Sequence, residues 1–207
     1  MTEAHEDPAA DIAWMRRLAE EGAGAPMQGA SILMAAGLIY GFGGLFHWAV
    51  LSGLTGLDES AVGFGWMAAT VLFLSVLVFV CLRLGRREGV RTAANRASGA
   101  VWSSVGWGIF ALFSSMAVLG WRLGEEAVLI AFGLMPSVIM VFYGMGWAVS
   151  AAMSKSRRLW MLAIASFAAA PLLATLTGTD EQYLAYAAAL FLLMALPGWL
   201  LMRSARA

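Results

Sequence analysis

Six long apolar stretches, separated by short clusters of charge, dominate this sequence and restrict the folds open to it. Between Arg17 and Arg83 the only charged residues are Glu20, Glu21, Asp58 and Glu59. Apolar runs of about 18 residues or more with few charges are typical of membrane-spanning helices. Charged residues make up 13% of the chain, whereas soluble domains carry about 25%. We therefore expect an integral membrane protein.

The apolar stretches predict an all-α fold, a bundle of six transmembrane helices, because none of them alternates polar and apolar residues as barrel strands do. Each has the roughly 17 to 25 residues that a helix needs to cross about 30 Å of hydrocarbon. The expected spans are 29–53, 61–83, 99–121, 127–152, 159–176 and 182–202. They form one transmembrane domain, 29–202, between an N-terminal tail, 1–28, and a C-terminal tail, 203–207.

The N-terminal tail predicts one further element, a short amphipathic helix over residues 11–22. Ile12, Met15 and Leu18 fall on one face at helical spacing, while the charged residues occupy another. We expect this helix to lie on the inner leaflet or to dock on a partner.

The distribution of positive charge predicts the orientation of the bundle. If the spans alternate, all of the 13 Lys and Arg residues except Arg122 fall on one side of the membrane. Lys and Arg are retained on the cytoplasmic side, so we expect both termini to be cytoplasmic, in a bacterial inner (cytoplasmic) membrane. The inner basic surface includes five arginines between the second and third spans: Arg83, Arg86, Arg87, Arg91 and Arg96. Membrane lipids are its expected contact, and nucleic acid is not, because no recognised binding module accompanies the arginines.

Tryptophans and acidic pairs mark the predicted ends of the spans. Seven tryptophans fall near those ends, where aromatic belts are expected: Trp48, Trp66, Trp121, Trp102, Trp147, Trp160 and Trp199. Three outer connections carry the pairs Asp58-Glu59, Glu125-Glu126 and Asp180-Glu181. We interpret these carboxylates as helix caps that complement the helix dipole. A cation-attracting mouth or a divalent-metal site is the alternative, and we expect no metal.

His47 is the ionisable ring of the first span and the leading candidate for a functional group. At helical spacing Gly37, Tyr40, Gly44, His47 and Leu51 form one seam, and small residues let membrane helices approach closely. The seam is therefore expected to face other helices. A neutral histidine hydrogen-bonded across a helix interface is the preferred interpretation. A pore-lining or proton-responsive group is one alternative, and axial ligation of a haem or chlorin is another.

Two short stretches resemble each other across the chain. Tyr143-Gly144-Met145-Gly146 in the fourth span matches Tyr40-Gly41-Phe42-Gly43 in the first. A three-plus-three inverted repeat, as in many transporters, would explain the match. A chain with 23 glycines can also contain such a four-residue match by coincidence. Pro136, Pro171 and Pro197 also predict kinks in the last three spans.

The sequence favours a protein without catalytic activity. It carries no HExxH, GxSxG or Walker-type motif, and no charged residue lies deep inside a span, where ion-coupled transporters keep their relays. We expect an accessory or assembly subunit, or a homo-oligomer, that packs against another membrane protein or itself. The alternative is a channel or permease for a small neutral solute, with His47, Tyr40 and Tyr143 near its path.

Overall fold

The computed structural model describes residues 12–14, 29–85 and 93–204, and this part of the chain is helical apart from turns and short connections. The all-α fold class is therefore confirmed. Six of the helical segments are long and apolar enough to cross a membrane, so the chain is an integral membrane protein. Residues 12–14 are helical, and the rest of the predicted amphipathic helix, 11–22, lies outside the described residues.

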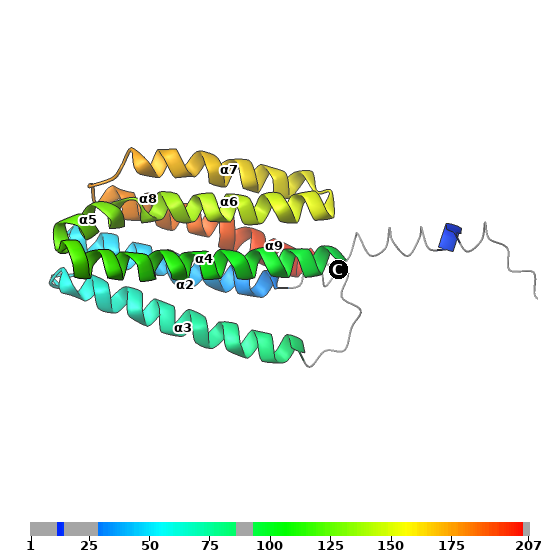
Figure 1. Cartoon of the computed structure of the whole chain (residues 1–207), viewed down its shortest axis with the longest axis horizontal. Helices are drawn as coiled ribbons and strands as arrows, with labels where there is room; N and C mark the ends of the chain where they lie inside the picture. Colours follow the sequence, from blue (N-terminus) through cyan, green and yellow to red (C-terminus); the bar gives the residue numbers. More distant parts are fainter. Residues whose placement is uncertain (1–11, 15–28, 86–92, 205–207) are drawn as a thin grey trace, which may run out of the picture.

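The spans are helices that run nearly parallel and antiparallel to one another (Figure 1). Hydrocarbon offers no hydrogen-bond partners, so each span satisfies its backbone internally as a helix. The first five spans are α2 (Ala30–Leu51), α3 (Ser60–Gly85), α4 (Ala93–Leu123), α6 (Met135–Ser154) and α7 (Arg157–Ala174). The sixth is a continuous run of α8 (Glu181–Leu190), the π-helix η1 (Phe191–Ala195) and α9 (Leu196–Ser204).

The predicted fourth span, 127–152, is divided into two helices. The short helix α5 (Glu125–Gly133) ends one turn before Pro136, and α6 begins at Met135. Proline is tolerated in the first turn of a helix, where its missing N–H has no partner to lose. Pro171 lies inside α7, which continues to Ala174, and Pro197 directly follows the first residue of α9. The three prolines thus act differently: one starts a helix, one lies within a continuous helix, and one follows a π-helix.

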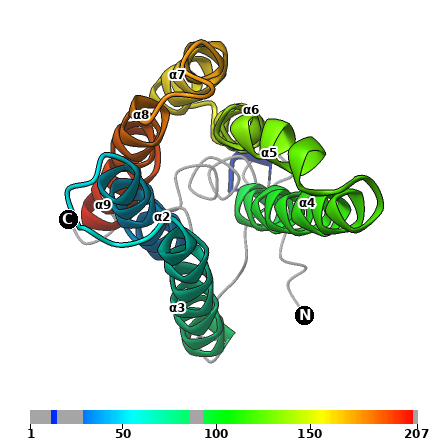
Figure 2. The same ribbon diagram turned by 90° about the vertical axis from the view of Figure 1, so that its left-hand side faces the viewer.

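Viewed along the bundle, the helices follow an open arc (Figure 2). Contacts run in the order α3, α2, the α8–α9 run, α7, α6 and α4, so that α3 and α4 are the two ends. The buried core lies toward the middle of this arc, around Met140, Trp147, Leu190 and Met194. Half of the most apolar part of α6 is buried (50%), against 6% for α3 and 11% for α4. The two end helices therefore expose most of their surface.

Small residues bring α2 into close antiparallel contact with the last span. A Cβ atom on Gly37 would overlap the backbone of Ala195, and a Cβ on Gly41 would lie 2.6 Å from the Phe191 ring. A Cβ on Gly44 would lie 3.2 Å from the Ala187 Cβ atom. Gly37 requires glycine because backbone of the partner helix occupies the space that a side chain would need, while Gly41 and Gly44 are tightly packed against that helix.

The acidic pairs meet the starts of α3 and α8 in different ways. Asp58 caps α3, whereas at α8 it is Glu181, in the first turn, that complements the helix dipole. An Asp58 carboxylate oxygen accepts a hydrogen bond of 2.9 Å from the backbone N–H of Ser60, the first residue of α3. Asp180 is the N-cap of α8 but makes no side-chain cap. Its backbone is helical (φ −63°, ψ −34°), whereas capping side chains need an extended N-cap residue. The N-cap of α5 is Gly124, which has no side chain to offer.

Candidate functional site

His47 lies between three spans and is held by aromatic neighbours from two of them. Its Nδ1 atom accepts a hydrogen bond of 3.0 Å from the indole N–H of Trp66 on α3. Its ring stacks on Tyr183 of α8, with ring centroids 3.4 Å apart and planes inclined by 28°. Because an indole N–H can only donate, Nδ1 is the unprotonated nitrogen of a neutral ring. This arrangement ties α2, α3 and α8 together and satisfies a polar group that hydrocarbon would leave unpaired.

The four tyrosines of the chain lie near one another in the bundle. Tyr40 packs against Trp66, with centroids 6.3 Å apart, and against Phe73, with centroids 5.3 Å apart. Tyr186 lies within electrostatic range of the other three, Tyr40, Tyr143 and Tyr183. Tyr143 and Tyr186 are buried, while Tyr40 and Tyr183 are half-buried. This part of the bundle interior is therefore rich in aromatic rings.

The predicted seam of α2 divides between two neighbouring elements. Gly37 and Gly44 contact the last span, whereas Tyr40 contacts α3 and His47 contacts both α3 and α8. Leu51, the fifth seam residue, is the last residue of α2 and is half-buried.

The two Tyr-Gly-x-Gly stretches make matching contacts. Each tyrosine packs against a tryptophan, Tyr40 on Trp66 and Tyr143 on Trp102. The glycine that follows each tyrosine meets a phenylalanine ring: a Cβ on Gly41 or on Gly144 would lie 2.6 Å from Phe191 or Phe167, respectively. The second glycine of each stretch, Gly43 or Gly146, faces the same tryptophan as the tyrosine.

These matching contacts do not follow the order of a sequential repeat. A three-plus-three repeat would pair the second span with the fifth and the third with the sixth. Here the tryptophans come from the second and third spans, α3 and α4, and the phenylalanines from the fifth and sixth, α7 and η1. The likeness is therefore one of local packing about the two ends of the arc.

A tryptophan of α6 donates to a backbone carbonyl in the π-helix of the last span. Pro197 has no N–H to donate to the carbonyl of Leu193, its partner in an ordinary helix. The indole N–H of Trp147 donates to that carbonyl instead, over 3.0 Å. Trp147 is fully buried, so this bond fixes α6 against the last span where its helix is irregular.

A serine pair joins α4 to α6 near the basic end of the bundle. The hydroxyls of Ser98 and Ser150 lie 2.9 Å apart, and both side chains are buried. The Trp102 indole N–H donates to the Ser150 hydroxyl over 3.2 Å, and that hydroxyl donates to the carbonyl of Gly146. The chain of bonds is complete without a ligand.

A buried side-chain amide joins helices at the opposite end of the bundle, where the acidic pairs lie. The side-chain amide of Gln182, the second residue of α8, donates to the carbonyl of Gly133 over 2.7 Å and to that of Leu173 over 3.2 Å. Gly133 ends α5, and Leu173 lies in the last turn of α7. Gln182 therefore anchors the break between α5 and α6 to the start of the last span.

Of the predicted inner basic surface, the structure describes Arg83 and Arg96. The guanidinium of Arg83 lies over the Phe79 ring, 4.4 Å from its centroid, and Arg96 is exposed. Arg86, Arg87 and Arg91 lie outside the described residues.

Two hollows on the described surface bear on ligand binding. One, of about 360 Å³, lies between α2 and α3, and the other, of about 420 Å³, lies between α4 and α5. Neither is lined by His47, Tyr40 or Tyr143. Among the described residues no group of three or more His, Cys, Asp or Glu side chains could hold a metal ion.

Sequence reasoning does not single out Ser98, Ser150 and Gln182, whose buried polar groups join the helices, and it misassigns three tryptophans. The sequence places Trp66, Trp102 and Trp147 in interfacial belts, but each donates an indole hydrogen bond within the bundle.

No protein-family profile matches the chain, and neither the curated proteins nor the solved structures contain a significant match.

Proposed function

We propose that this protein is a non-catalytic subunit of a membrane assembly, and that the exposed face of α4 packs against another membrane protein or a second copy of the chain. The observation that carries the proposal is the difference between the two end helices of the arc. Few residues of either helix are buried, but α3 has a mean hydropathy of 2.4 and α4 only 1.5.

The side chains on the two exposed faces explain this difference. The exposed positions of α3 hold many large apolar residues, as expected of a surface that faces lipid: Phe64, Met67, Val71, Leu72, Leu74, Val78, Phe79 and Leu82. The exposed positions of α4 include many small residues: Gly99, Ala100, Ser103, Ser104, Gly106, Ala111, Ser114, Ser115 and Ala117. Small residues and serine are enriched where membrane helices pack together, because the backbones can then approach closely.

The exposed residues of α4 also follow the spacing of a helix-packing stripe. Ser104, Trp107, Ala111, Ser114 and Val118 succeed one another at steps of three and four, and all are exposed. Trp107 is 69% exposed and packs edge-on against exposed Phe110, and exposed tryptophan is enriched among the residues that anchor interfaces. The Ser104 and Ser114 hydroxyls donate to carbonyls of their own helix, which lowers the cost of placing them in an apolar interface.

The contacts of His47 favour this proposal over a channel or permease. Its Nδ1 atom and one face of its ring are already engaged by Trp66 and Tyr183, and neither of the two hollows described above is lined by His47. A neutral, hydrogen-bonded histidine of this kind is ordinary packing between membrane helices.

We further propose a bacterial inner membrane with both termini in the cytoplasm. The described basic residues other than Arg122 lie at one end of the bundle, where α3 and α9 end and α7 begins: Arg83, Arg96, Lys155, Arg157, Arg158 and Arg203. Positive charge of this kind is retained on the cytoplasmic side.

Substitution of a small residue on α4 tests the proposed interface. Ala111→Leu places a larger side chain in the middle of the stripe, and Ser75→Leu places the same side chain at an exposed residue of α3 that lies outside the hollows described above. After mild extraction from the host membrane, we expect Ala111→Leu to lose most of the larger assembly and Ser75→Leu to retain it. Equal recovery of the assembly with both variants would contradict docking through α4.

A further inference from the structure

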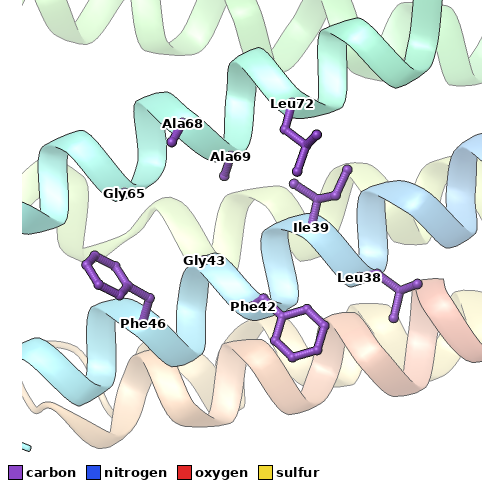
Figure 3. Close-up of a pocket in the computed structure, with 9 residues that line it drawn as sticks. All are labelled: Leu38, Ile39, Phe42, Gly43, Phe46, Gly65, Ala68, Ala69 and Leu72. Atoms are coloured by element: carbon purple, nitrogen blue, oxygen red, sulfur yellow. The ribbon is translucent and has the colours of Figure 1, made fainter. Parts of the chain in front are cut away.

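The hollow between α2 and α3 is an apolar groove within the membrane-spanning part of the bundle. Figure 3 shows Phe46 of α2 at one end of it, pointing toward Gly65 of α3, and Ile39 and Leu72 approaching each other toward the other end. Between them the helices present Gly43 and Ala68. The volume of about 360 Å³ is open to the surroundings of the bundle rather than enclosed.

The groove exists because small residues oppose one another at this crossing of the two helices. The Phe46 ring rests directly on Gly65, where a Cβ atom would lie 2.5 Å from it. Beyond that contact, Gly43 and Ala68 have too little side chain to fill the space. A water molecule needs two to four polar partners, and every residue that lines the groove is apolar or glycine. The natural occupant is therefore hydrocarbon.

The depth of the groove selects the leaflet that can supply this hydrocarbon. Gly65 lies six residues after Glu59, at the acidic end of α3, and Leu72 lies eleven residues before Arg83, at the basic end. At about 1.5 Å per residue, the groove begins about 9 Å from the acidic end of α3 and stops about 16 Å before its basic end. The tails of each leaflet extend about 15 Å, half of the roughly 30 Å hydrocarbon core. Lipids of the leaflet at the acidic end therefore reach the groove along much of their tails.

The charge at that end selects the headgroup. Asp58 and Glu59 are exposed. An aspartate carboxyl is ionised at neutral pH, and the hydrogen bond from the Ser60 N–H lowers the pKa of Asp58 further. A primary ammonium group offers three N–H donors to such carboxylates. A quaternary ammonium offers none, and an anionic headgroup is repelled.

From the groove, its depth and this charge, we infer that α2 and α3 bind one phospholipid with a primary-amine headgroup. Its acyl chain lies in the groove over Gly43 and Ala68, and its ammonium group lies at Asp58 and Glu59. The exposed large apolar residues of α3 agree with a lipid rather than a protein as the neighbour of this helix. The site is independent of the assembly face proposed on α4.

Native mass spectrometry of the full chain, depleted of lipid and then titrated with defined lipids, tests the inference. The probes are phosphatidylethanolamine, phosphatidylcholine and phosphatidylglycerol with identical acyl chains. Wild-type protein should bind one molecule of phosphatidylethanolamine with an affinity about fivefold or more above the other two. Ala68→Leu fills the groove and should abolish this binding, whereas Ala168→Leu, the same change at an exposed residue of α7, should leave it unaltered.

A pair of charge substitutions tests the headgroup contact separately. Asp58→Asn with Glu59→Gln should remove the preference for the primary amine, and Asp180→Asn with Glu181→Gln, the matched pair at α8, should preserve it. These positions are exposed, so the variants remain informative even if Ala68→Leu fails to fold. Equal binding of the three lipids, unchanged binding by Ala68→Leu, or a second protein covering the groove in place of lipid would each overturn the inference.

Discussion

The close contact between α2 and the last span makes a quantitative prediction about Gly37. In Gly37→Ala the new Cβ would lie 2.8 Å from the Cα atom of Ala195. That neighbour is backbone and cannot rotate away, so the helices must separate. Overpacking of this kind costs about 1 to 3 kcal/mol. Alanine also favours a helix over glycine by about 0.5 to 1 kcal/mol, which offsets part of the loss.

Gly63→Ala on α3 is the matched control because a Cβ there meets nothing within 4 Å. The helix preference is common to both variants, so their difference in free energy of unfolding isolates the packing cost. We expect Gly37→Ala to be less stable than Gly63→Ala by about 1 to 3 kcal/mol. Unfolding in mixed dodecylmaltoside and SDS micelles, followed by far-UV circular dichroism, measures this difference. Equal stabilities would refute the close packing of α2 on the last span.

Three further predictions concern hydrogen bonds and orientation. Trp66→Phe and His47→Phe should each destabilise the protein, and a double-mutant cycle should give a coupling of about 0.6 to 1.7 kcal/mol, whereas additivity would deny the hydrogen bond. Trp147→Phe should lower the free energy of unfolding by about 1 to 3 kcal/mol because the Leu193 carbonyl loses its hydrogen bond from the indole. The control Trp160→Phe, at a 44% exposed residue, should change stability little, and similar losses in both variants would count against the bond. A C-terminal green fluorescent protein fusion should fluoresce and a C-terminal alkaline phosphatase fusion should be inactive, since both report a cytoplasmic terminus; the opposite pattern would reverse the proposed orientation.

The membrane and the helical spans could be predicted because they depend on averages along the chain. A run of apolar residues long enough to cross the bilayer is recognisable whatever helices surround it. Pro136 also signalled an irregularity in the fourth span, although the division at Leu134 into α5 and α6 exceeds a kink.

The order of the helices around the arc could not be predicted from the sequence. In a helix that is apolar on every side, hydropathy gives the depth of a residue but not the direction in which it points. The position of Trp147 in the sequence therefore indicates an interfacial residue, although it is fully buried and bonded to the last span. The same limit applies to His47, whose partners Trp66 and Tyr183 belong to spans that the sequence does not place beside it.

The proposal that this chain is a subunit of a membrane assembly is tested most directly by its mass in the native state. Native mass spectrometry after gentle extraction from the host membrane measures this mass whatever the identity of the partner. We expect a species heavier than one chain by at least one further protein chain, and we expect Ala111→Leu to disrupt it. A single chain carrying only lipid would contradict the proposal.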